Sequence, residues 1–403
     1  MNIVVIGGGA AGFFAAIVAA EAGARVAILE RGNAVLQKVR ISGGGRCNVT
    51  HACFDARALV QHYPRGSREL LGPFSRFGPK DTVEWFAQRG VRLKTEDDGR
   101  MFPVSDDSQT IVECLWNAAK QAGVQVRTGV RVERIEQTAS GWLVHTGRHT
   151  PEPADRVLLA GGSSEGLWAM LADLGHTIVP PVPSLFTFNC KDTRLRDLAG
   201  VSVREAGVEI SGTKLAANGP VLVTHWGLSG PAILRLSAWG ARILHDMGYQ
   251  FTLSVNWLGS KSSDEIGADL NRLKMENARK QIGAHAQFGL PVRLWERLVE
   301  SADIPPDLRW GDASRQVLAR LAEALGRSGF AIRGKSTFKE EFVTAGGVSL
   351  REVHFKTFES RLFPGLYFAG ETLDIDAITG GFNFQAAWTG GWIAGHAMTG
   401  QSD

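Results

Sequence analysis

Three glycines near the N-terminus constrain the fold of this chain more than any other feature. Gly7, Gly9 and Gly12 follow a short apolar run, residues 2–6, and precede an alanine-rich stretch. In this G-x-G-x-x-G spacing the first glycine permits a tight turn, the second lets a phosphate approach the backbone, and the third lets a helix pack on a strand. Residues 25–29 read as the next strand, so the pattern predicts a strand, a helix and a second, parallel strand.

The start of such a helix is a binding site for a pyrophosphate, because its free N–H groups and the positive end of its dipole attract anions. Glu30 ends the second predicted strand, where a carboxylate can accept hydrogen bonds from the adenosine ribose hydroxyls. Arg31 is a candidate contact to adenine or phosphate, with a solvated surface role as the alternative. The N-terminal residues expected to bind a dinucleotide are Gly7, Gly9, Ala10, Ala11, Gly12, Glu30 and Arg31.

The C-terminal part of the chain favours a flavin dinucleotide over a nicotinamide one. A predicted strand enters Gly370-Glu371, and Gly380-Gly381 begins the final predicted helix. This layout resembles the C-terminal FAD motif of two-dinucleotide-fold flavoproteins, in which the N-terminus of a helix faces the isoalloxazine ring. The segment 160–162, Ala-Gly-Gly after a strand, resembles the middle motif of the same superfamily. We therefore expect FAD to be bound by segments from both ends of the chain.

Further motifs make the likeness closer. Residues 38–50 (KVRISGGGRCNVT), 224–231 (THWGLSGP), 344–348 (TAGGV) and 370–383 resemble the hallmark segments of the BaiN-like flavoproteins, a family of NAD(P)/FAD-dependent oxidoreductases. The motifs extend from residue 7 to about residue 395, so the resemblance covers the whole chain. One departure is His51, where the family often has asparagine.

Motif positions and the resemblance together add further candidate cofactor-binding residues. Val132, in a strand predicted at 131–136, matches the position whose backbone often meets the adenine. The full additional set is Lys38, Ser42, Gly43, Gly44, Gly45, Arg46, Cys47, Val132, Ala160, Gly161, Gly162, Gly370, Glu371, Asp374, Gly380, Gly381, Phe382 and Asn383. Arg46 could neutralise pyrophosphate or steady the flavin, or it could form a structural salt bridge.

The fold class expected is α/β, with a discontinuous Rossmann-like FAD domain, a β-barrel-like insert, and a helical insert carried by that barrel. Residues 31–53 read as a glycine-rich loop region, and the proline cluster at 180–183 marks a boundary. Ser262 and Glu265 form a capping box at the start of the helical insert. The predicted domains are residues 1–182 with 345–403, residues 183–258 with 330–344, and residues 259–329.

His225 is the one candidate catalytic residue, because it lies in a glycine-flanked segment before a predicted helix and histidine titrates near neutral pH. A hydrogen-bonded structural histidine is the alternative. Cys47 and Cys53 have the spacing C-x5-C, unlike the C-x4-C of disulfide reductases, so a dithiol mechanism is rejected and Cys53 is expected to be buried and unreactive. Asp374 and Asp376 lack a His or Cys to complete a site, and no metal is expected.

The composition says more about the cellular compartment of the protein than about its binding partners. With only four cysteines and no basic region ahead of the apolar N-terminus, a cytoplasmic protein without a signal peptide is expected. No apolar run is long enough to suggest a membrane partner. The net charge of +3 neither requires nor excludes nucleic acid, and it leaves the oligomeric state open. Basic residues at 333, 335, 339, 356 and 361 could face RNA, or form a mixed surface with the glutamates between them.

The sequence supports three hypotheses for function. The first is a reductase in which NAD(P)H, docking transiently because only one fingerprint is present, supplies electrons through FAD to a C=C bond. The resemblance implies an unsaturated ring as substrate, uracil in ribosomal RNA among the candidates. The second is a flavin-dependent oxidase or dehydrogenase of a small amine. The third is a flavin-binding RNA partner without catalytic turnover.

Overall fold

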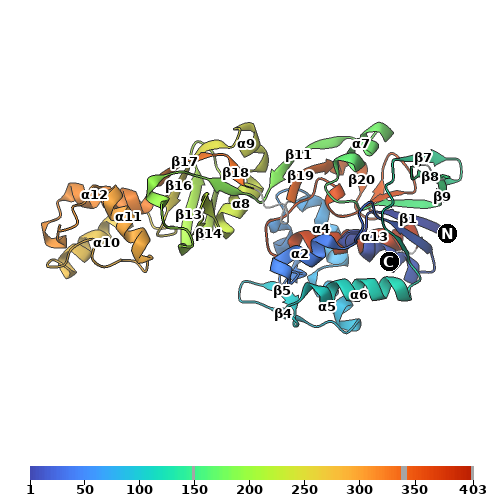
Figure 1. Ribbon diagram of the computed structural model, residues 1–403, viewed down its shortest axis with the longest axis horizontal. Helices are drawn as coiled ribbons and strands as arrows, with labels where there is room; N and C mark the ends of the chain where they lie inside the picture. The colour runs from blue at the N-terminus through green and yellow to red at the C-terminus, as the bar shows by residue number, and fades with distance from the viewer. Residues whose placement is uncertain (148–149, 337–342, 401–403) are drawn as a thin grey trace. The chain divides into compact units, whose positions relative to one another are not determined.

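The computed structural model describes residues 1–147, 150–336 and 343–400. The chain forms two compact units, residues 1–182 with 343–403 and residues 183–342 (Figure 1). The first unit is therefore assembled from both ends of the chain, and the second is a single continuous segment. Lys339, Glu340 and Glu341, part of the basic and acidic stretch considered above, lie outside the described residues.

The first unit is built on a seven-stranded sheet with the order β20-β21-β22-β10-β1-β2-β6. Five adjacent strands, β22, β10, β1, β2 and β6, run parallel to one another. The other two strands, β21 and β20, extend the sheet beyond β22 through antiparallel pairings. The strands are β1 (Asn2–Ile6), β2 (Arg25–Leu29), β6 (Gln125–Arg127), β10 (Arg156–Leu159), β20 (Val353–His354), β21 (Glu359–Ser360) and β22 (Leu366–Phe368). The predicted parallel strand–helix–strand unit is confirmed, and the sheet is Rossmann-like.

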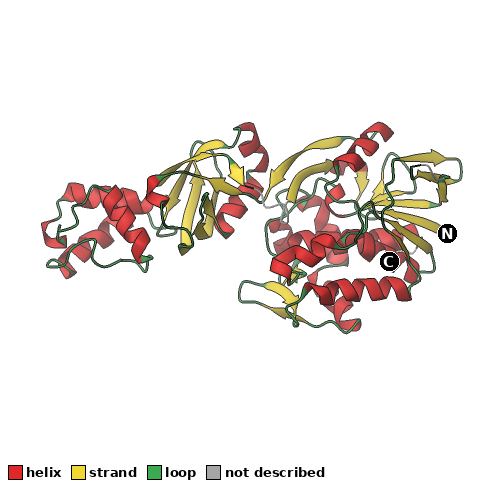
Figure 2. Ribbon diagram, viewed as in Figure 1, coloured by secondary structure: helices red, strands yellow, loops and turns green. Residues whose placement is uncertain are grey.

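In the first unit, helices lie beside the strands of the sheet (Figure 2). Helices α1 (Ala10–Glu21) and α13 (Phe382–Met398) pack directly on each other. A Cβ atom on Gly391 would lie 2.8 Å from the Ala11 carbonyl oxygen, and one on Gly395 would lie 2.9 Å from the Ala15 carbonyl oxygen. The absence of side chains at these positions lets the two backbones approach closely. The N-terminal and C-terminal motifs are thereby brought to the same end of the sheet.

Smaller elements surround this centre. An antiparallel sheet contains β3 (Thr50–His51), β5 (Arg100–Pro103) and β4 (Leu93–Thr95), and another contains β7 (Arg134–Thr138), β8 (Gly141–His145) and β9 (Glu152–Ala154). The remaining helices are α2 (Gln37–Gly45), α3 (Ala56–Leu59), α4 (Ser67–Arg76), α5 (Pro79–Gln88), α6 (Ser108–Gln121) and α7 (Glu165–Leu174). A short 3-10 helix, η1 (Val60–His62), follows α3.

Two local predictions need correction. Part of the expected loop at 31–53 forms α2. The strand expected at 131–136 begins only at Arg134, so Val132 precedes it. The boundary predicted at the proline cluster agrees with the end of the first unit at Val182. The cluster lies within β11 (Ile178–Ser184), which pairs with β19 (Val343–Val348) in a two-stranded sheet. Proline is tolerated there because a strand at the edge of a sheet has N–H groups that need no partner.

The second unit contains a seven-stranded sheet with the order β17-β16-β13-β14-β15-β12-β18. Its two end strands, β17 and β18, are joined in the chain by Gly334 alone, so the two edges of the sheet approach each other at this residue. The strands are β12 (Thr187–Asn189), β13 (Ser202–Ile210), β14 (Ala216–Val223), β15 (Gly227–Ser229), β16 (Gln250–Asn256), β17 (Ser328–Arg333) and β18 (Lys335–Ser336).

Helices α8 (Pro231–Trp239) and α9 (Ala241–Asp246) lie between β15 and β16 in the chain. Helices α10 (Ser263–Glu276), α11 (Val292–Ser301) and α12 (Arg315–Gly326) share one hydrophobic core with the sheet. The predicted capping box is confirmed, since the Ser262 hydroxyl accepts a hydrogen bond from the Glu265 N–H and the Glu265 carboxylate accepts one from the Ser262 N–H. Among the described residues, no helix combines the length and apolar character needed to cross a lipid bilayer.

Candidate cofactor-binding site

The turn between β1 and α1 has the steric requirements expected of the glycine motif. Gly7 has a φ of +114°, and a Cβ atom there would lie 2.5 Å from the Ala160 carbonyl oxygen. A Cβ atom on Gly12 would lie 2.1 Å from the Gly7 carbonyl oxygen. Gly9 is different, because a Cβ atom there would meet no atom within 4 Å. The first and third glycines are needed for packing, whereas the second leaves open space beside the backbone.

The first turn of α1 has the free backbone N–H groups that bind anions. Gly9 is the N-cap and supplies no side-chain cap, and the first turn contains no acidic residue. The N–H groups at the start of the helix, including those of Ala10 and Ala11, therefore have no side-chain partner. The open space at Gly9 lies at this same point. Such a site has the chemistry that binds a pyrophosphate group.

Glu30 lies at the end of β2 and is held by two backbone N–H groups. Its carboxylate accepts hydrogen bonds from the Gly8 nitrogen at 2.8 Å and the Gly32 nitrogen at 2.7 Å. These bonds fix the carboxylate at the carboxyl end of β2 and leave further lone pairs for ribose hydroxyls. The exposed Arg31 extends toward the loop after β10, with its Nη1 3.4 Å from the Ser164 hydroxyl.

The segment after Val39 breaks the helical path of α2. Ser42 is extended, and Gly43, Gly44 and Gly45 have φ values of +57°, +67° and +85°. A Cβ atom on Gly44 or Gly45 would meet nothing within 4 Å, so this stretch of backbone also borders open space. Consecutive N–H groups in such left-handed conformations can form a concave anion-binding nest.

Cys47 follows this segment with a φ of +60° and is completely buried, and burial raises the pKa of its thiol to about 12. Cys53 is half-buried, which corrects the expectation of a buried residue. Burial raises its thiol pKa as well. Both thiols therefore remain protonated near neutral pH, and neither has the thiolate character that dithiol redox chemistry requires.

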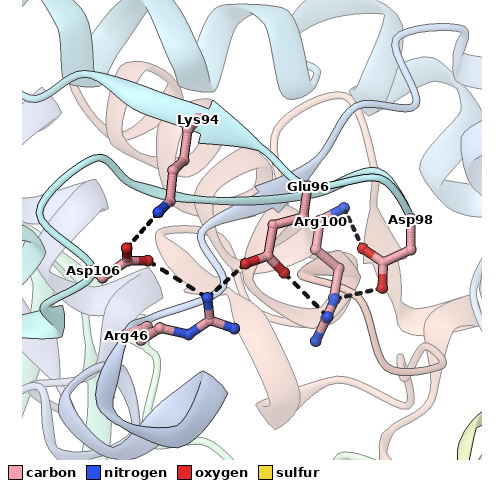
Figure 3. A network of polar contacts seen from close by, with 6 residues as sticks. All are labelled: Arg46, Lys94, Glu96, Asp98, Arg100 and Asp106. Atoms are coloured by element: carbon pink, nitrogen blue, oxygen red, sulfur yellow. Dashed lines mark hydrogen bonds and ion pairs between the residues drawn. The ribbon is translucent and has the colours of Figure 1, made fainter.

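Arg46 belongs to a network of charged residues drawn in Figure 3. Its Nη1 lies 2.6 Å from Glu96 Oε1 and 3.5 Å from Asp106 Oδ1. Its guanidinium carbon also lies 3.9 Å from the centroid of the Phe102 ring. The hydrogen bond to Glu96 raises the pKa of Arg46, and Lys94 lowers the pKa of Asp106. In this structure Arg46 therefore makes the salt bridge that was the structural alternative.

The middle and C-terminal motifs meet the start of α1. Lys38 Nζ lies 2.5 Å from Glu371 Oε2, and a Cβ atom on Gly162 would lie 3.8 Å from the same oxygen. Gly370, with a φ of +68°, approaches α1 so closely that its Cβ would lie 3.1 Å from the Ala11 Cβ. Segments from residues 7–12, 38, 160–162 and 370–371 thus surround one end of the parallel sheet.

The start of α13 completes this region. Gly381 is the N-cap with a φ of +87°, and a Cβ atom there would lie 2.5 Å from the Thr50 carbonyl oxygen. Phe382 stacks on the His51 ring, with 4.6 Å between the centroids. The Asn383 amide holds the preceding loop by accepting a hydrogen bond from the Ala377 nitrogen and donating one to the Ala377 carbonyl oxygen.

Other candidates lie elsewhere. Val132 is half-buried in the segment before β7, and the Asp374 N–H donates to the Val348 carbonyl oxygen. Asp376 is buried and forms a bidentate ion pair with Arg65. His225 belongs to the second unit, where it is exposed in the turn between β14 and β15.

Comparison with known proteins identifies the family. Residues 1–397 match the family model described as the HI0933-like protein Rossmann domain. The chain belongs to the HI0933-like family. A 3-dehydro-bile acid delta(4,6)-reductase of Clostridium scindens is 32% identical to it over 98% of each chain. A ribosomal RNA dihydrouridine synthase of Escherichia coli K12 is 29% identical over 97% of this chain and 96% of the relative. The resemblance to BaiN-like flavoproteins is thus confirmed.

Solved structures support the fold of this HI0933-like protein. The 3-ketosteroid-delta4-(5alpha)-dehydrogenase of Rhodococcus jostii RHA1 has a TM-score of 0.53 at 15% identity, with 98% of this chain and 96% of that chain covered. The 3-ketosteroid delta1-dehydrogenase of Sterolibacterium denitrificans has a TM-score of 0.51 at 12% identity, with 99% of each chain covered. The family and the fold together make this protein an enzyme, a flavoprotein oxidoreductase.

The motifs did not reveal two features of the site. The Gly8 nitrogen holds Glu30, yet Gly8 is a variable position in the fingerprint. The segment from His62 to Arg65 contacts the loop before α13, although more than 300 residues separate them in the sequence. Gly8 could have been suspected because it lies within a run of three glycines. The segment 62–65 has no comparable sequence pattern.

Proposed function

We propose that this HI0933-like protein is an FAD-dependent reductase that uses NAD(P)H to saturate a C=C bond in an unsaturated ring. The observation that carries the proposal is the joining of N-terminal, middle and C-terminal motifs around one sheet end, where Gly9 borders open space and α1 has no side-chain cap. The full-length similarity to two reductive relatives supports the direction of the reaction.

The residues at this sheet end fit FAD group by group. The start of α1 would hold the pyrophosphate, and the Glu30 carboxylate would accept hydrogen bonds from the ribose hydroxyls. The backbone of Gly44 and Gly45 and the start of α13 would face the flavin. When bound, FAD supplies two-electron redox chemistry, and the positive end of the α13 dipole would stabilise negative charge on the ring.

A single dinucleotide fingerprint supports a transient nicotinamide cofactor. Gly7, Gly9 and Gly12 provide one such motif, and the sequence contains no second copy of it. FAD would occupy that motif permanently, so NADH or NADPH would dock and leave during each catalytic cycle. His225 is the proposed proton donor to the substrate, since its imidazole is exposed and imidazole is a common general acid.

The class of substrate is proposed from the shared chemistry of the two relatives. One is named for a delta(4,6) reduction of a 3-dehydro-bile acid, and the other for making dihydrouridine in ribosomal RNA. Both names describe the addition of two hydrogen atoms across a C=C bond conjugated with a carbonyl group. We infer a planar, conjugated ring ketone or imide as the substrate of this protein, with uracil in ribosomal RNA as one candidate.

The first experiment is anaerobic reduction of the purified protein. We expect a flavin absorption spectrum that bleaches on addition of NADH or NADPH and recovers on addition of a conjugated ring substrate. A steroid 4,6-dien-3-one and uridine-containing ribosomal RNA are the two probes, and mass spectrometry would detect the two added hydrogen atoms. A protein that stays oxidised with both nicotinamides but consumes oxygen with a small amine would instead be an oxidase. RNA binding without any change in the RNA would favour the non-catalytic hypothesis.

A further inference from the structure

The loop at residues 374–382 is held in place by a short segment that the motifs did not reveal. This segment, residues 62–66, begins at the last residue of η1 and ends at the N-cap of α4, and it is named the 62–66 clamp. The loop belongs to the C-terminal motif and ends at the start of α13. Four residues of the clamp contact the loop, through hydrogen bonds, ring stacking, an ion pair and close backbone packing.

The first contacts are at the α13 end of the loop. The Tyr63 hydroxyl donates a hydrogen bond to the Phe382 carbonyl oxygen at 2.6 Å. The His62 ring stacks on the Phe382 ring with 4.2 Å between centroids and 18° between planes. Tyr63 is completely buried, and burial raises the pKa of its hydroxyl well above the ordinary value. The hydroxyl therefore stays protonated and remains a donor at every physiological pH.

The second contacts are along the loop itself. The Ile378 N–H donates to the His62 carbonyl oxygen at 3.1 Å. Arg65 makes a bidentate ion pair with Asp376, whose side chain is 0% exposed. Gly66, with a φ of +84°, lies so close to the loop that its Cβ would be 2.7 Å from Ile375 Cγ1. Bidentate pairs of this kind fix orientation as well as distance.

We propose that the 62–66 clamp positions the start of α13 against the bound flavin and thereby sets the flavin's reduction potential. The proposal rests on the FAD site proposed above. The N–H groups at the start of α13 favour negative charge, and their effect decreases steeply with distance and misalignment. Tyr63 and His62 hold the first residue of that helix, so they act through its backbone as positioning residues.

The test is Tyr63→Phe, which removes one hydroxyl and keeps the ring that packs on Phe74 with 5.2 Å between centroids. We expect the ratio of affinities for reduced over oxidised FAD to fall by about tenfold, which corresponds to a potential about 30 mV more negative. A shift of the visible flavin absorption band should accompany it. Both are measured on the holoenzyme, by anaerobic redox titration against a reference dye.

Tyr367→Phe is the matched control, because Tyr367 is also buried in the first unit and its hydroxyl contacts Arg156 and Glu359 instead of the loop. It should lower the melting temperature to a similar extent and leave the potential unchanged. A second pair, His62→Ala and His62→Phe, covers the case in which Tyr63→Phe does not fold. Only His62→Ala should shift the potential, since a phenyl ring preserves the stacking.

The outcomes separate this inference from the proposed function. If Tyr63→Phe and His62→Ala keep the wild-type potential and spectrum, the inference is overturned while the FAD site stands. If the wild-type protein binds no flavin when mixed with FAD, the proposed function fails and the inference fails with it. An equal shift in Tyr63→Phe and Tyr367→Phe would reduce the clamp to a general contribution to stability and would also overturn the inference.

Discussion

Gly9 differs from the two other glycines of its motif in what a side chain would meet. A Cβ atom on Gly12 would collide with the Gly7 carbonyl oxygen at 2.1 Å, whereas one on Gly9 would meet nothing within 4 Å. Gly9 also has a negative φ of −89° that other residues readily adopt. Glycine at position 9 is therefore not required for folding, and it leaves space in which a ligand can approach the backbone.

We predict that Gly9→Val gives a folded but colourless protein. Losing the approach of pyrophosphate to the backbone should remove hydrogen bonds worth about 3 kcal/mol, which is about a hundredfold in the Kd for FAD. The apoprotein melting temperature should stay within about 2 °C of wild type, because the site is open. Isothermal titration with FAD and thermal melts of the apoproteins measure the two effects. Gly72→Val, in an equally open position of α4, should bind FAD normally.

The surroundings of the His51 ring determine its protonation state. Its Nε2 lies 3.1 Å from the Asp98 carbonyl oxygen, and its Nδ1 is buried without a hydrogen-bond partner. Burial lowers the pKa of His51, and the charge of Arg100 lowers it further, while Asp98 acts in the opposite direction. The folded protein therefore favours the neutral ring, whereas the unfolded chain takes up a proton at about pH 6.5.

The stability of the protein therefore depends on pH through His51. Below pH about 6.5 the unfolded state binds more protons than the folded state at this site, so stability falls as the pH decreases, and the penalty is absent above that pH. We predict that His51→Asn loses less stability than wild type between pH 7.5 and pH 5.5, values about one unit either side of the unfolded pKa. Urea unfolding at both pH values measures this. The exposed His245→Asn should behave like wild type, and an equally acid-sensitive His51→Asn would contradict the prediction.

Helix α13 is tied to its neighbours by polar groups that water does not reach. Gln385 is 0% exposed, and its Oε1 accepts hydrogen bonds from the Thr50 hydroxyl at 2.6 Å and the Thr82 hydroxyl at 3.0 Å. Its Nε2 donates to the Thr389 hydroxyl at 3.1 Å. Because buried donors without acceptors are costly, this network fixes the axial position of the helix relative to β3 and α5.

We predict that Gln385→Leu lowers the free energy of unfolding by about 2–3 kcal/mol, since it leaves the buried Thr50 and Thr82 hydroxyls without their acceptor. Chemical denaturation of the apoprotein measures it. Gln121→Leu, an exposed replacement at the end of α6, should change stability by less than about 0.5 kcal/mol. Equal stabilities for the two variants would show that the buried network contributes nothing.

The elements that sequence predicts well are those with a local cause. Gly7 and Gly12 reveal the first turn because only glycine fits there, and Ser262 with Glu265 reveals the start of α10 because the cap is formed within four residues. Partners distant in sequence leave no such pattern. The pairing of Arg46 with Glu96 and the hydrogen bond from Tyr63 to Phe382 depend on how separate elements pack. The residue types of Arg46 and Tyr63 do not by themselves indicate these partners.

At the scale of the whole molecule, the first unit contains its own parallel sheet and all the candidate cofactor-binding residues, whereas His225 belongs to the second unit. The chain leaves the first unit along β11 and returns along β19, and these two strands pair with each other. A Cβ atom on Gly346 would lie 2.6 Å from Pro181 Cα, and the Ser349 N–H donates to the Thr177 carbonyl oxygen. Residue numbers thus rise along one strand as they fall along the other.

This geometry predicts that residues 183–342 can be replaced by a Gly/Ser linker of about four residues, which would turn β11 and β19 into a hairpin. The shortened protein should bind FAD with the same loss in Gly9→Val as the full chain. It should have no reductase activity, because it lacks His225, the proposed proton donor. Flavin spectra and anaerobic turnover measure the two properties. A shortened protein that unfolds cooperatively but stays colourless with added FAD would mean that the second unit contributes to the cofactor site.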